Sequence, residues 1–163
     1  AKHLSKEGWI LDLISENEER SISSKEALDY LDANFYLADL SKKSSIKEII
    51  SNYETPDLIV ANAGIAINGS IGKLGESQKE DAYYLMCGGV IDLIEGFVPK
   101  MIKKGIGRIV IISSIGAITA MPKSSIYASA KAGIYAYGKH GPPLLKKYKT
   151  LSTATPALLM TGC

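Results

Sequence analysis

Short apolar runs, separated by longer helical stretches, make up most of the 163-residue chain. Arg108–Ser113 is β-branched almost throughout, which is typical of strands buried on both faces of a parallel sheet. Four more runs have strand length. The five predicted strands are Trp9–Ile14, Asn34–Ala38, Asp57–Ala61, Arg108–Ser113 and Leu151–Thr155.

Helical patterns fill the segments between these runs. Apolar residues recur at three-to-four spacing in Ile46–Tyr53 and Ser77–Lys104, and another helix is expected from Ser124 or Ser125 to Lys149. Pro99 should kink or end the second of these helices. Alternating strands and helices imply right-handed βαβ crossovers. We therefore predict a single α/β domain over residues 1–163, with a doubly wound parallel sheet in three α/β/α layers.

Composition and charge narrow the classes of function. Hydrophobic residues make up 46% of the chain and charged residues 22%, as in ordinary globular domains. The net charge is +2 without a dense basic run, so neither nucleic acid nor a membrane is indicated as a partner. Cys87 and Cys163 make no disulfide framework, and no His/Cys cluster has metal-ligand spacing. We expect a reduced, cytoplasmic setting and no bound metal. Residues 1–8 read as the end of an amphipathic helix instead of a signal peptide.

Polar residues follow the predicted strands. In doubly wound sheets, ligands bind outside the carboxyl ends of the strands. The residues in that position are Ser15, Asp39, Asn62, Ser114 and Pro156. We therefore expect the functional site at this edge.

Tyr127 and Lys131 stand four residues apart, on one face of a predicted helix. A phenol ordinarily ionises near pH 10, and a neighbouring cation favours the phenolate. Ser114, which follows the preceding strand, could hydrogen-bond a substrate carbonyl and hold it against the phenol. The three residues suit proton transfer during carbonyl reduction, with the hydride supplied by a cofactor.

A second pair, Tyr135 and Lys139, repeats the spacing eight residues later. Spacing alone therefore also fits a surface tyrosine packed beside a lysine stem. The context separates the pairs, because Ser114 lies thirteen residues before Tyr127, whereas Pro122 lies thirteen before Tyr135. We interpret the second pair as ordinary helix residues.

These motifs, in this order, resemble the short-chain dehydrogenase/reductase family. Arg-Ile-Val-Ile-Ile-Ser-Ser (108–114) and Tyr-Ala-Ser-Ala-Lys-Ala-Gly (127–133) are similar to its catalytic strand and helix. The resemblance implies a Rossmann-like fold and an NAD(P)-dependent oxidoreductase acting on a carbonyl or alcohol. By this resemblance, Tyr127 would be the general acid/base, and Lys131 would lower its pKa and bind the nicotinamide ribose. The Ser114 hydroxyl would orient the substrate.

The resemblance extends to residues that would bind the cofactor. Asn62-Ala63-Gly64 is similar to the family's Asn-Ala-Gly turn, and Asp39-Leu40 resembles the pair that borders the adenine. By residue type alone, each could equally be a plain turn. Pro156-Ala157 and Thr161 resemble the loop near the nicotinamide amide, with Ala157 in place of the usual glycine.

The chain departs from the family pattern at its start. The family opens with a strand and a glycine-rich turn that holds the pyrophosphate, and neither is present before Trp9. That strand would lie between the strands Trp9–Ile14 and Asp57–Ala61, which would otherwise face each other across a gap with unpaired backbone groups. We therefore expect the 163 residues to be part of a longer polypeptide that also includes the family's last strand. Gly141-Pro142-Pro143, which would interrupt the last helix, supports the same expectation.

A further departure concerns catalysis. Counting back from Phe97, the family's catalytic asparagine falls on Met86, which cannot hold a water in a proton relay. This replacement motivates an alternative, a non-catalytic relative that keeps the fold to bind a ligand or partner.

Cofactor preference would depend on the end of the second strand of the family fold. Ser15 leaves room for the 2′-phosphate of NADP, whereas the next residue, Glu16, would repel it, so NAD is slightly favoured. The resemblance also implies a homodimer or homotetramer paired through the helices Ser77–Lys104 and Ser124–Lys149. The substrate would be a small molecule.

Overall fold

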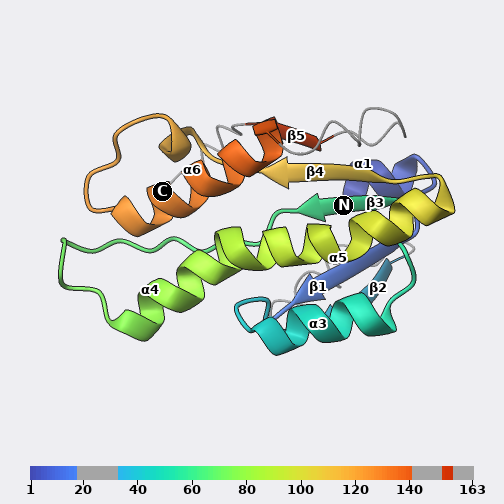
Figure 1. Ribbon diagram of the computed structural model, residues 1–163, viewed down its shortest axis with the longest axis horizontal. Helices are drawn as coiled ribbons and strands as arrows, with labels where there is room; N and C mark the ends of the chain where they lie inside the picture. The colour runs from blue at the N-terminus through green and yellow to red at the C-terminus, as the bar shows by residue number, and fades with distance from the viewer. Residues whose placement is uncertain (18–32, 141–151, 156–163) are drawn as a thin grey trace. The chain divides into compact units, whose positions relative to one another are not determined.

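The computed structural model describes residues 1–17 and 33–140 and the backbone of residues 152–155. The chain divides into two compact units, Ala1–Leu40 and Ser41–Cys163. The elements of both are labelled in Figure 1. Parts of the predictions for residues 16–32 and 141–163 lie outside the described residues.

The first unit contains a two-stranded parallel sheet. Helix α1 (Lys2–Lys6) precedes strand β1 (Leu11–Ser15), which pairs in parallel with β2 (Ala33–Leu37). Gly8, at φ +82°, ends the helix, because its left-handed backbone lets the next N–H bond back to the Leu4 carbonyl. The helix expected at residues 1–8 is therefore present.

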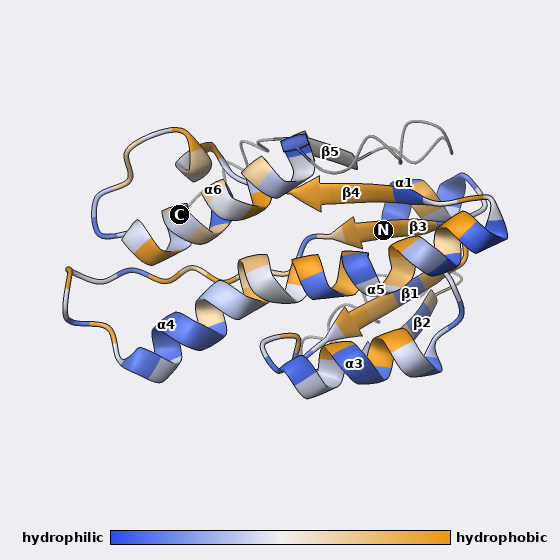
Figure 2. Ribbon diagram, in the orientation of Figure 1, coloured by the Kyte–Doolittle hydropathy of each residue, from blue (hydrophilic) through white to orange (hydrophobic). Residues whose placement is uncertain are grey.

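The second unit contains a three-stranded parallel sheet. Strand β4 (Arg108–Ile112) lies between β3 (Leu58–Ala61) and β5 (Ser152–Thr155). Ile109 and Ile111 of β4 are almost completely buried. Figure 2 shows β3 and β4 as the continuous hydrophobic strands that the β-branched pattern predicted. The chain thus forms parallel α/β structure, as expected, with its strands divided between two sheets.

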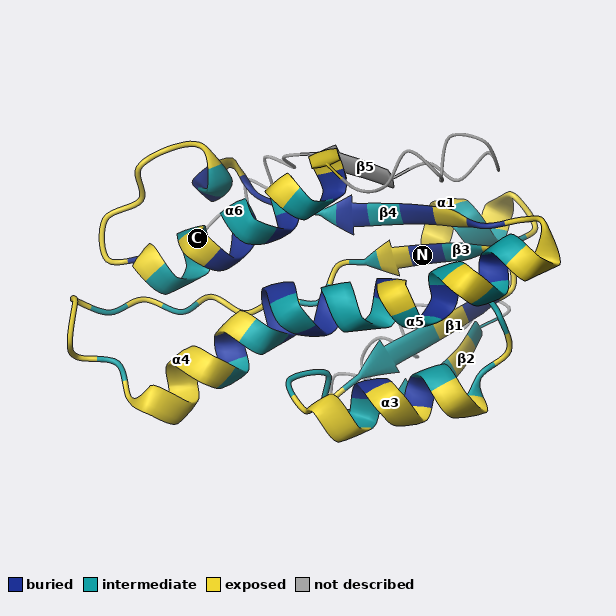
Figure 3. Cartoon of the chain, viewed as in Figure 1, coloured by how far each residue is buried: buried dark blue, intermediate teal, exposed yellow. Residues whose placement is uncertain are grey.

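Helices supply most of the remaining core of the second unit. They are α3 (Lys43–Asn52), α4 (Glu76–Tyr83), α5 (Gly89–Lys104) and α6 (Ser125–His140). Figure 3 shows α4 largely exposed, in contrast to the buried stretch that follows it. The most deeply buried apolar side chains in the helical segments are Ile46, Ile49, Ala82, Met86, Cys87, Ile94, Phe97, Met101, Ala130 and Ile134.

The predicted helix Ser77–Lys104 is interrupted in an unexpected way. A π-helical turn at Tyr84–Gly88 joins α4 to α5, whereas Pro99 lies inside α5 and does not end it. Packing against α3 accounts for the continuity: Ile50 lies directly over Gly96, and the Lys100 ammonium donates to the Ile50 carbonyl. The alternative that Pro99 ends the helix is wrong, and α3 contacts α5 on both sides of the proline, whereas a kink at Pro99 stays a prediction.

Among the described residues, none of the helices combines the length and the apolar character needed to span a bilayer.

Candidate active site

The carboxyl end of β4 places two serines in different roles. The Ser113 hydroxyl donates to the Lys131 carbonyl at 2.9 Å, which ties the strand to α6. The Ser114 oxygen instead accepts from the Gly116 N–H at 3.1 Å. Its own hydrogen has no acceptor among the described residues, so Ser114 can still donate to a substrate oxygen.

The start of α6 places Tyr127 beside this strand end. Ser124 is the N-cap, because its carbonyl accepts from the Ala128 N–H at 2.8 Å. Tyr127 is half-buried, and its Cε1 lies 3.4 Å from the position that a β-carbon on Gly116 would take. A larger residue than glycine would therefore crowd the ring. This contact brings Tyr127 and Ser114 to the same end of β4.

Lys131 is the most unusual charged residue of the site. Its side chain is only 5% exposed, and its Nζ donates to the Ile112 carbonyl at 2.9 Å. Burial lowers the Lys131 pKa, because water no longer stabilises the ammonium fully. Ile112 is its one acceptor among the described residues, so the ammonium keeps N–H groups available for a ligand.

Gly64 and Met86 complete the surroundings of this ammonium. A β-carbon on Gly64 would lie 3.6 Å from Lys131 Nζ and 3.7 Å from Met86 Cγ. The structure therefore brings Gly64 to Lys131, and Met86 of the π-helical turn lies on the Gly64 side of the ammonium. The thioether is a weak acceptor and leaves the ammonium without a strong polar neighbour there.

The π-helical turn itself packs against α6. A β-carbon on Gly133 would lie 3.0 Å from Cys87 Sγ and 3.4 Å from the Tyr83 hydroxyl. Burial raises the pKa of the Cys87 thiol. Cys87 therefore belongs to the packing between the helices, whereas Met86 lies toward Gly64.

Tyr135 and Lys139 occupy a different environment. The Lys139 Nζ lies 6.0 Å from the centre of the Tyr135 ring, and the lysine is exposed. This geometry is that of a lysine stem packed beside a surface tyrosine, as interpreted from the sequence.

The structure describes some, but not all, of the other residues that were predicted to bind the cofactor. Asn62 and Ala63 directly follow β3 and precede Gly64. In the first unit, the Ala38 N–H donates to the Ser15 carbonyl at 2.9 Å. Ser15 is the last residue of β1 and not the first residue after it, whereas Asp39-Leu40 follow β2. The positions Pro156, Ala157 and Thr161 lie outside the described residues.

Three contributors to the site were not predicted from the sequence. They are the Ile112 carbonyl, the Ser113 hydroxyl, and Asn68, whose side chain accepts from the Ser124 hydroxyl at 2.7 Å. Ser113 could have been suspected as the neighbour of Ser114. No local pattern indicates the Asn68 contact, which joins residues 56 positions apart.

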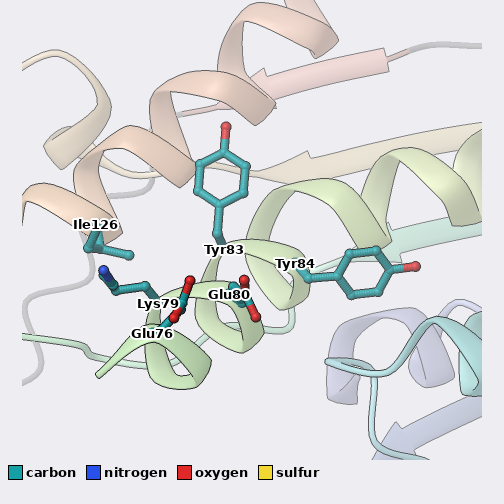
Figure 4. Close-up of a pocket in the computed structure, with 6 residues that line it drawn as sticks. All are labelled: Glu76, Lys79, Glu80, Tyr83, Tyr84 and Ile126. Carbon is teal, nitrogen blue, oxygen red and sulfur yellow. The ribbon is translucent and has the colours of Figure 1, made fainter. Parts of the chain in front are cut away.

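A shallow hollow lies elsewhere, beside α4 and the start of α6. Figure 4 shows its lining, with Tyr83 directed toward α6 and Tyr84 directed away from it. Glu76, Lys79, Glu80 and Ile126 complete the lining. It includes neither Ser114 nor Lys131, so we place the candidate site at the end of β4. In the described part of the chain, no group of three His, Cys, Asp or Glu side chains could hold a metal ion.

The sequence matches known proteins across most of its length. The family described as short chain dehydrogenase matches residues 1–149. The 3-oxoacyl-acyl-carrier-protein reductase FabG of Chlamydia trachomatis is 31% identical over 110 residues, which cover 65% of this chain and 44% of the relative. Nodulation protein G of Azospirillum brasilense is 27% identical over 147 residues, covering 86% of this chain and 58% of the relative. The chain thus spans about half the length of these curated relatives.

Solved structures agree with this match at the level of the fold. A short-chain dehydrogenase from Streptomyces avermitilis superposes with a TM-score of 0.82 at 20% identity, covering 96% of this chain and 58% of that one. A gluconate 5-dehydrogenase from Burkholderia cenocepacia, solved with NADP and tartrate, gives 0.74 at 21% identity, with 94% and 62% covered. The Rossmann-like α/β class predicted from the sequence is confirmed.

Proposed function

Since the chain belongs to the short chain dehydrogenase family, we propose that the protein is an NAD(P)-dependent oxidoreductase acting on a carbonyl or alcohol substrate. The single observation that carries this proposal is the buried Lys131 ammonium, one helical turn from Tyr127 and bound to the end of β4. Burying a lysine is unfavourable for folding, so its position at the same strand end as Ser114 favours a functional role.

Tyr127 is proposed as the general acid/base. In the direction of reduction, its phenol donates a proton to the carbonyl oxygen while the Ser114 hydroxyl donates a hydrogen bond to the same atom. Ser114 is suited to this task because its oxygen already accepts from Gly116 and its hydrogen is available. The positive charge of Lys131, one helical turn away, would stabilise the negative charge that this transfer leaves on the phenol oxygen.

The residues around Lys131 fit the nicotinamide ribose. Gly64 has no side chain to cover the ammonium, and Ile112 occupies only one of its N–H groups. The bound dinucleotide supplies or accepts the hydride. We propose that Tyr127 and Lys131 hold its ribose, and that the wider set of contacts is Ser15, Asp39, Leu40, Asn62, Ala63, Gly64, Pro156, Ala157 and Thr161.

Cofactor preference is proposed to lean toward NAD. Glu16 follows Ser15 at the end of β1 and is exposed, so its carboxylate would repel a 2′-phosphate. Two proteins of similar fold were solved with NADP. The preference of this protein between NADH and NADPH therefore tests the role proposed for Glu16. Glu16→Gln should raise kcat/KM for NADPH relative to NADH, and an unchanged ratio would contradict the role of Glu16.

We propose further that the protein forms a homodimer or homotetramer. The proposal rests on the family resemblance, which implies pairing through the two long helical segments, here α4–α5 and α6. Light scattering of the purified protein tests it, and a monomer at micromolar concentration would contradict it.

A second candidate function is that of a non-catalytic relative, which binds a ligand through the same fold. Met86 favours it, because the thioether beside Gly64 provides no strong acceptor for an ordered water next to Lys131.

The two candidates are separated by binding and turnover of the same purified protein, after its intact mass is measured. NADH and NADPH binding is followed by nucleotide fluorescence and thermal shift, and carbonyl reduction by the loss of reduced nicotinamide absorbance. Tyr127→Phe should lower kcat by about a thousandfold, with dinucleotide binding retained. Tyr135→Phe, its matched control on the same helix, should leave kcat unchanged.

Dinucleotide binding without turnover of any carbonyl or alcohol would support the non-catalytic candidate. Absence of binding by a folded protein of this mass would overturn the oxidoreductase proposal for this chain.

A further inference from the structure

The segment between Ser114 and α6 exposes large apolar side chains. Ile115 is 38% exposed, Ile118 is 61% exposed and Met121 is 39% exposed. Lys123 is the one charged residue between Ser114 and Ser124. Exposed apolar side chains gathered on one short segment commonly mark a binding surface.

The segment is held in place at both ends, so the exposure does not come from a loose loop. At its start, the N–H groups of Ile118 and Thr119 both donate to the Ile115 carbonyl at 3.0 Å. At its end, the Gly69 N–H donates to the Lys123 carbonyl at 2.8 Å, next to the hydrogen bond between Ser124 and Asn68.

Lys123 shows how closely the end of the segment is specified. Its φ of +62° lies in the left-handed region, which is unfavourable for a residue with a side chain. The contacts from the loop after β3 keep this backbone in place. The apolar side chains are therefore presented by a fixed backbone.

The exposed segment reaches the proposed proton donor. Met121 Sδ lies 2.4 Å from the position that a β-carbon on Gly116 would take, and Tyr127 Cε1 lies 3.4 Å from the same point. Met121 and the phenol ring therefore share the space over Gly116. A substrate whose carbonyl reaches Tyr127 would place its substituent on or near Met121.

We propose that the substrate carries an uncharged apolar substituent next to its carbonyl group, and that Met121 and Ile118 bind this substituent. The inference rests on the proposed oxidoreductase function and names the substrate class of the same site. Ile115 extends the surface from the Ser114 side. Lys123 is the feature that would instead favour an anionic substituent, so the test compares the two chemistries.

The test measures kcat/KM for a series of methyl ketones of increasing chain length, from butanone to octanone, and for keto acids of matching length. With the native protein, kcat/KM should rise about fourfold for each added methylene group. The keto acids should be poorer substrates than the ketones of equal length.

Three variants locate the effect. Met121→Ser and Ile118→Ser should reduce the dependence on chain length, so that kcat/KM falls more for octanone than for butanone. Ile106→Ser is the matched control, because Ile106 is 51% exposed and precedes β4, at the strand end opposite Ser114. It should leave the dependence intact.

Turnover that is independent of chain length, a preference for the keto acids, or a native length dependence in Met121→Ser would overturn this inference and leave the proposed function standing. Failure to turn over any carbonyl compound would overturn the proposed function, and this inference with it.

Discussion

Two Tyr-x-x-x-Lys pairs lie eight residues apart on α6, and they differ in almost everything except spacing. Lys131 is 5% exposed and donates to the Ile112 carbonyl, whereas Lys139 is exposed, with its Nζ 6.0 Å from the centre of the Tyr135 ring. The helix is common to both pairs, so it cannot be the cause of the difference. The cause is the end of β4, which contacts the first pair through the Ile112 carbonyl and the Ser113 hydroxyl.

The comparison shows that tertiary contacts, and not the Tyr-x-x-x-Lys spacing, determine the environment of each lysine. Taking an ammonium out of water is unfavourable, and burial lowers the Lys131 pKa accordingly. Lys139, in contrast, is exposed to solvent. Substituting each of the two lysines, and each of the two serines at the end of β4, tests whether the unfavourable burial of Lys131 is connected with catalysis.

The largest effect is expected from removing the buried charge. Lys131→Met should lower kcat by about a thousandfold, because the phenolate of Tyr127 loses its neighbouring cation. The free energy of unfolding should change by no more than about 1 kcal/mol, since the relief of a buried charge opposes the loss of the hydrogen bond to Ile112. Turnover assays and urea unfolding measure the two quantities.

Lys139→Met is the matched control, and it should leave both kcat and stability nearly unchanged. Equal losses of activity in the two variants would show that helical spacing alone determines the function.

The serines at the end of β4 should separate chemistry from stability. Ser114→Ala should lower kcat by about a hundredfold, because it removes the proposed donor to the carbonyl oxygen. Ser113→Ala should instead lower the free energy of unfolding by about 1 kcal/mol, through loss of the buried hydrogen bond to the Lys131 carbonyl. Steady-state kinetics and chemical denaturation of both variants provide the comparison, and the reverse assignment of effects would contradict it.

The smallest effect concerns pH. Burial places the Lys131 pKa in the folded chain below its ordinary value of 10.5. Between these two pKa values the unfolded chain binds more protons, so this lysine makes folding more favourable as pH rises through that window. Below the folded pKa, both states are protonated and the contribution is constant. Unfolding free energies measured from neutral to alkaline pH should rise less in Lys131→Met than in Lys139→Met, and parallel profiles would contradict the assignment.

The sequence predicted the part of the site that depends on local pattern. The β-branched run before Ser114 indicated a buried strand, and the spacing to Tyr127 separated the two pairs on α6. These signals can be read from the sequence because the burial of a strand and the face of a helix follow from residues close together in the chain. The roles of the residues remain predictions until the variants are measured.

Contacts between segments far apart in the chain could not be predicted from the sequence. The hydrogen bond from Ser124 to Asn68 depends on where two loops meet, and the π-helical turn depends on the packing of Cys87 against Gly133. The helix end that was one alternative at Pro99 is absent for the same reason, since α3 contacts α5 on both sides of the proline. Outside the described residues, the proposed contacts of Pro156, Ala157 and Thr161 remain predictions.

The π-helical turn at Tyr84–Gly88 sets the rotational phase of the long helical segment. A π-type hydrogen bond closes over one residue more than an α-type bond, so the turn accommodates one additional residue without breaking the helix. Each residue advances an α-helix by about 100°. Deleting one residue would let this turn close as an α-helix, with α4 and α5 nearly in phase. The side chains of the turn itself would be redistributed around the helix, and a different side chain would replace Met86 beside Gly64. The identity of the residue that faces Lys131 is thus a matter of helical phase as well as of amino-acid type.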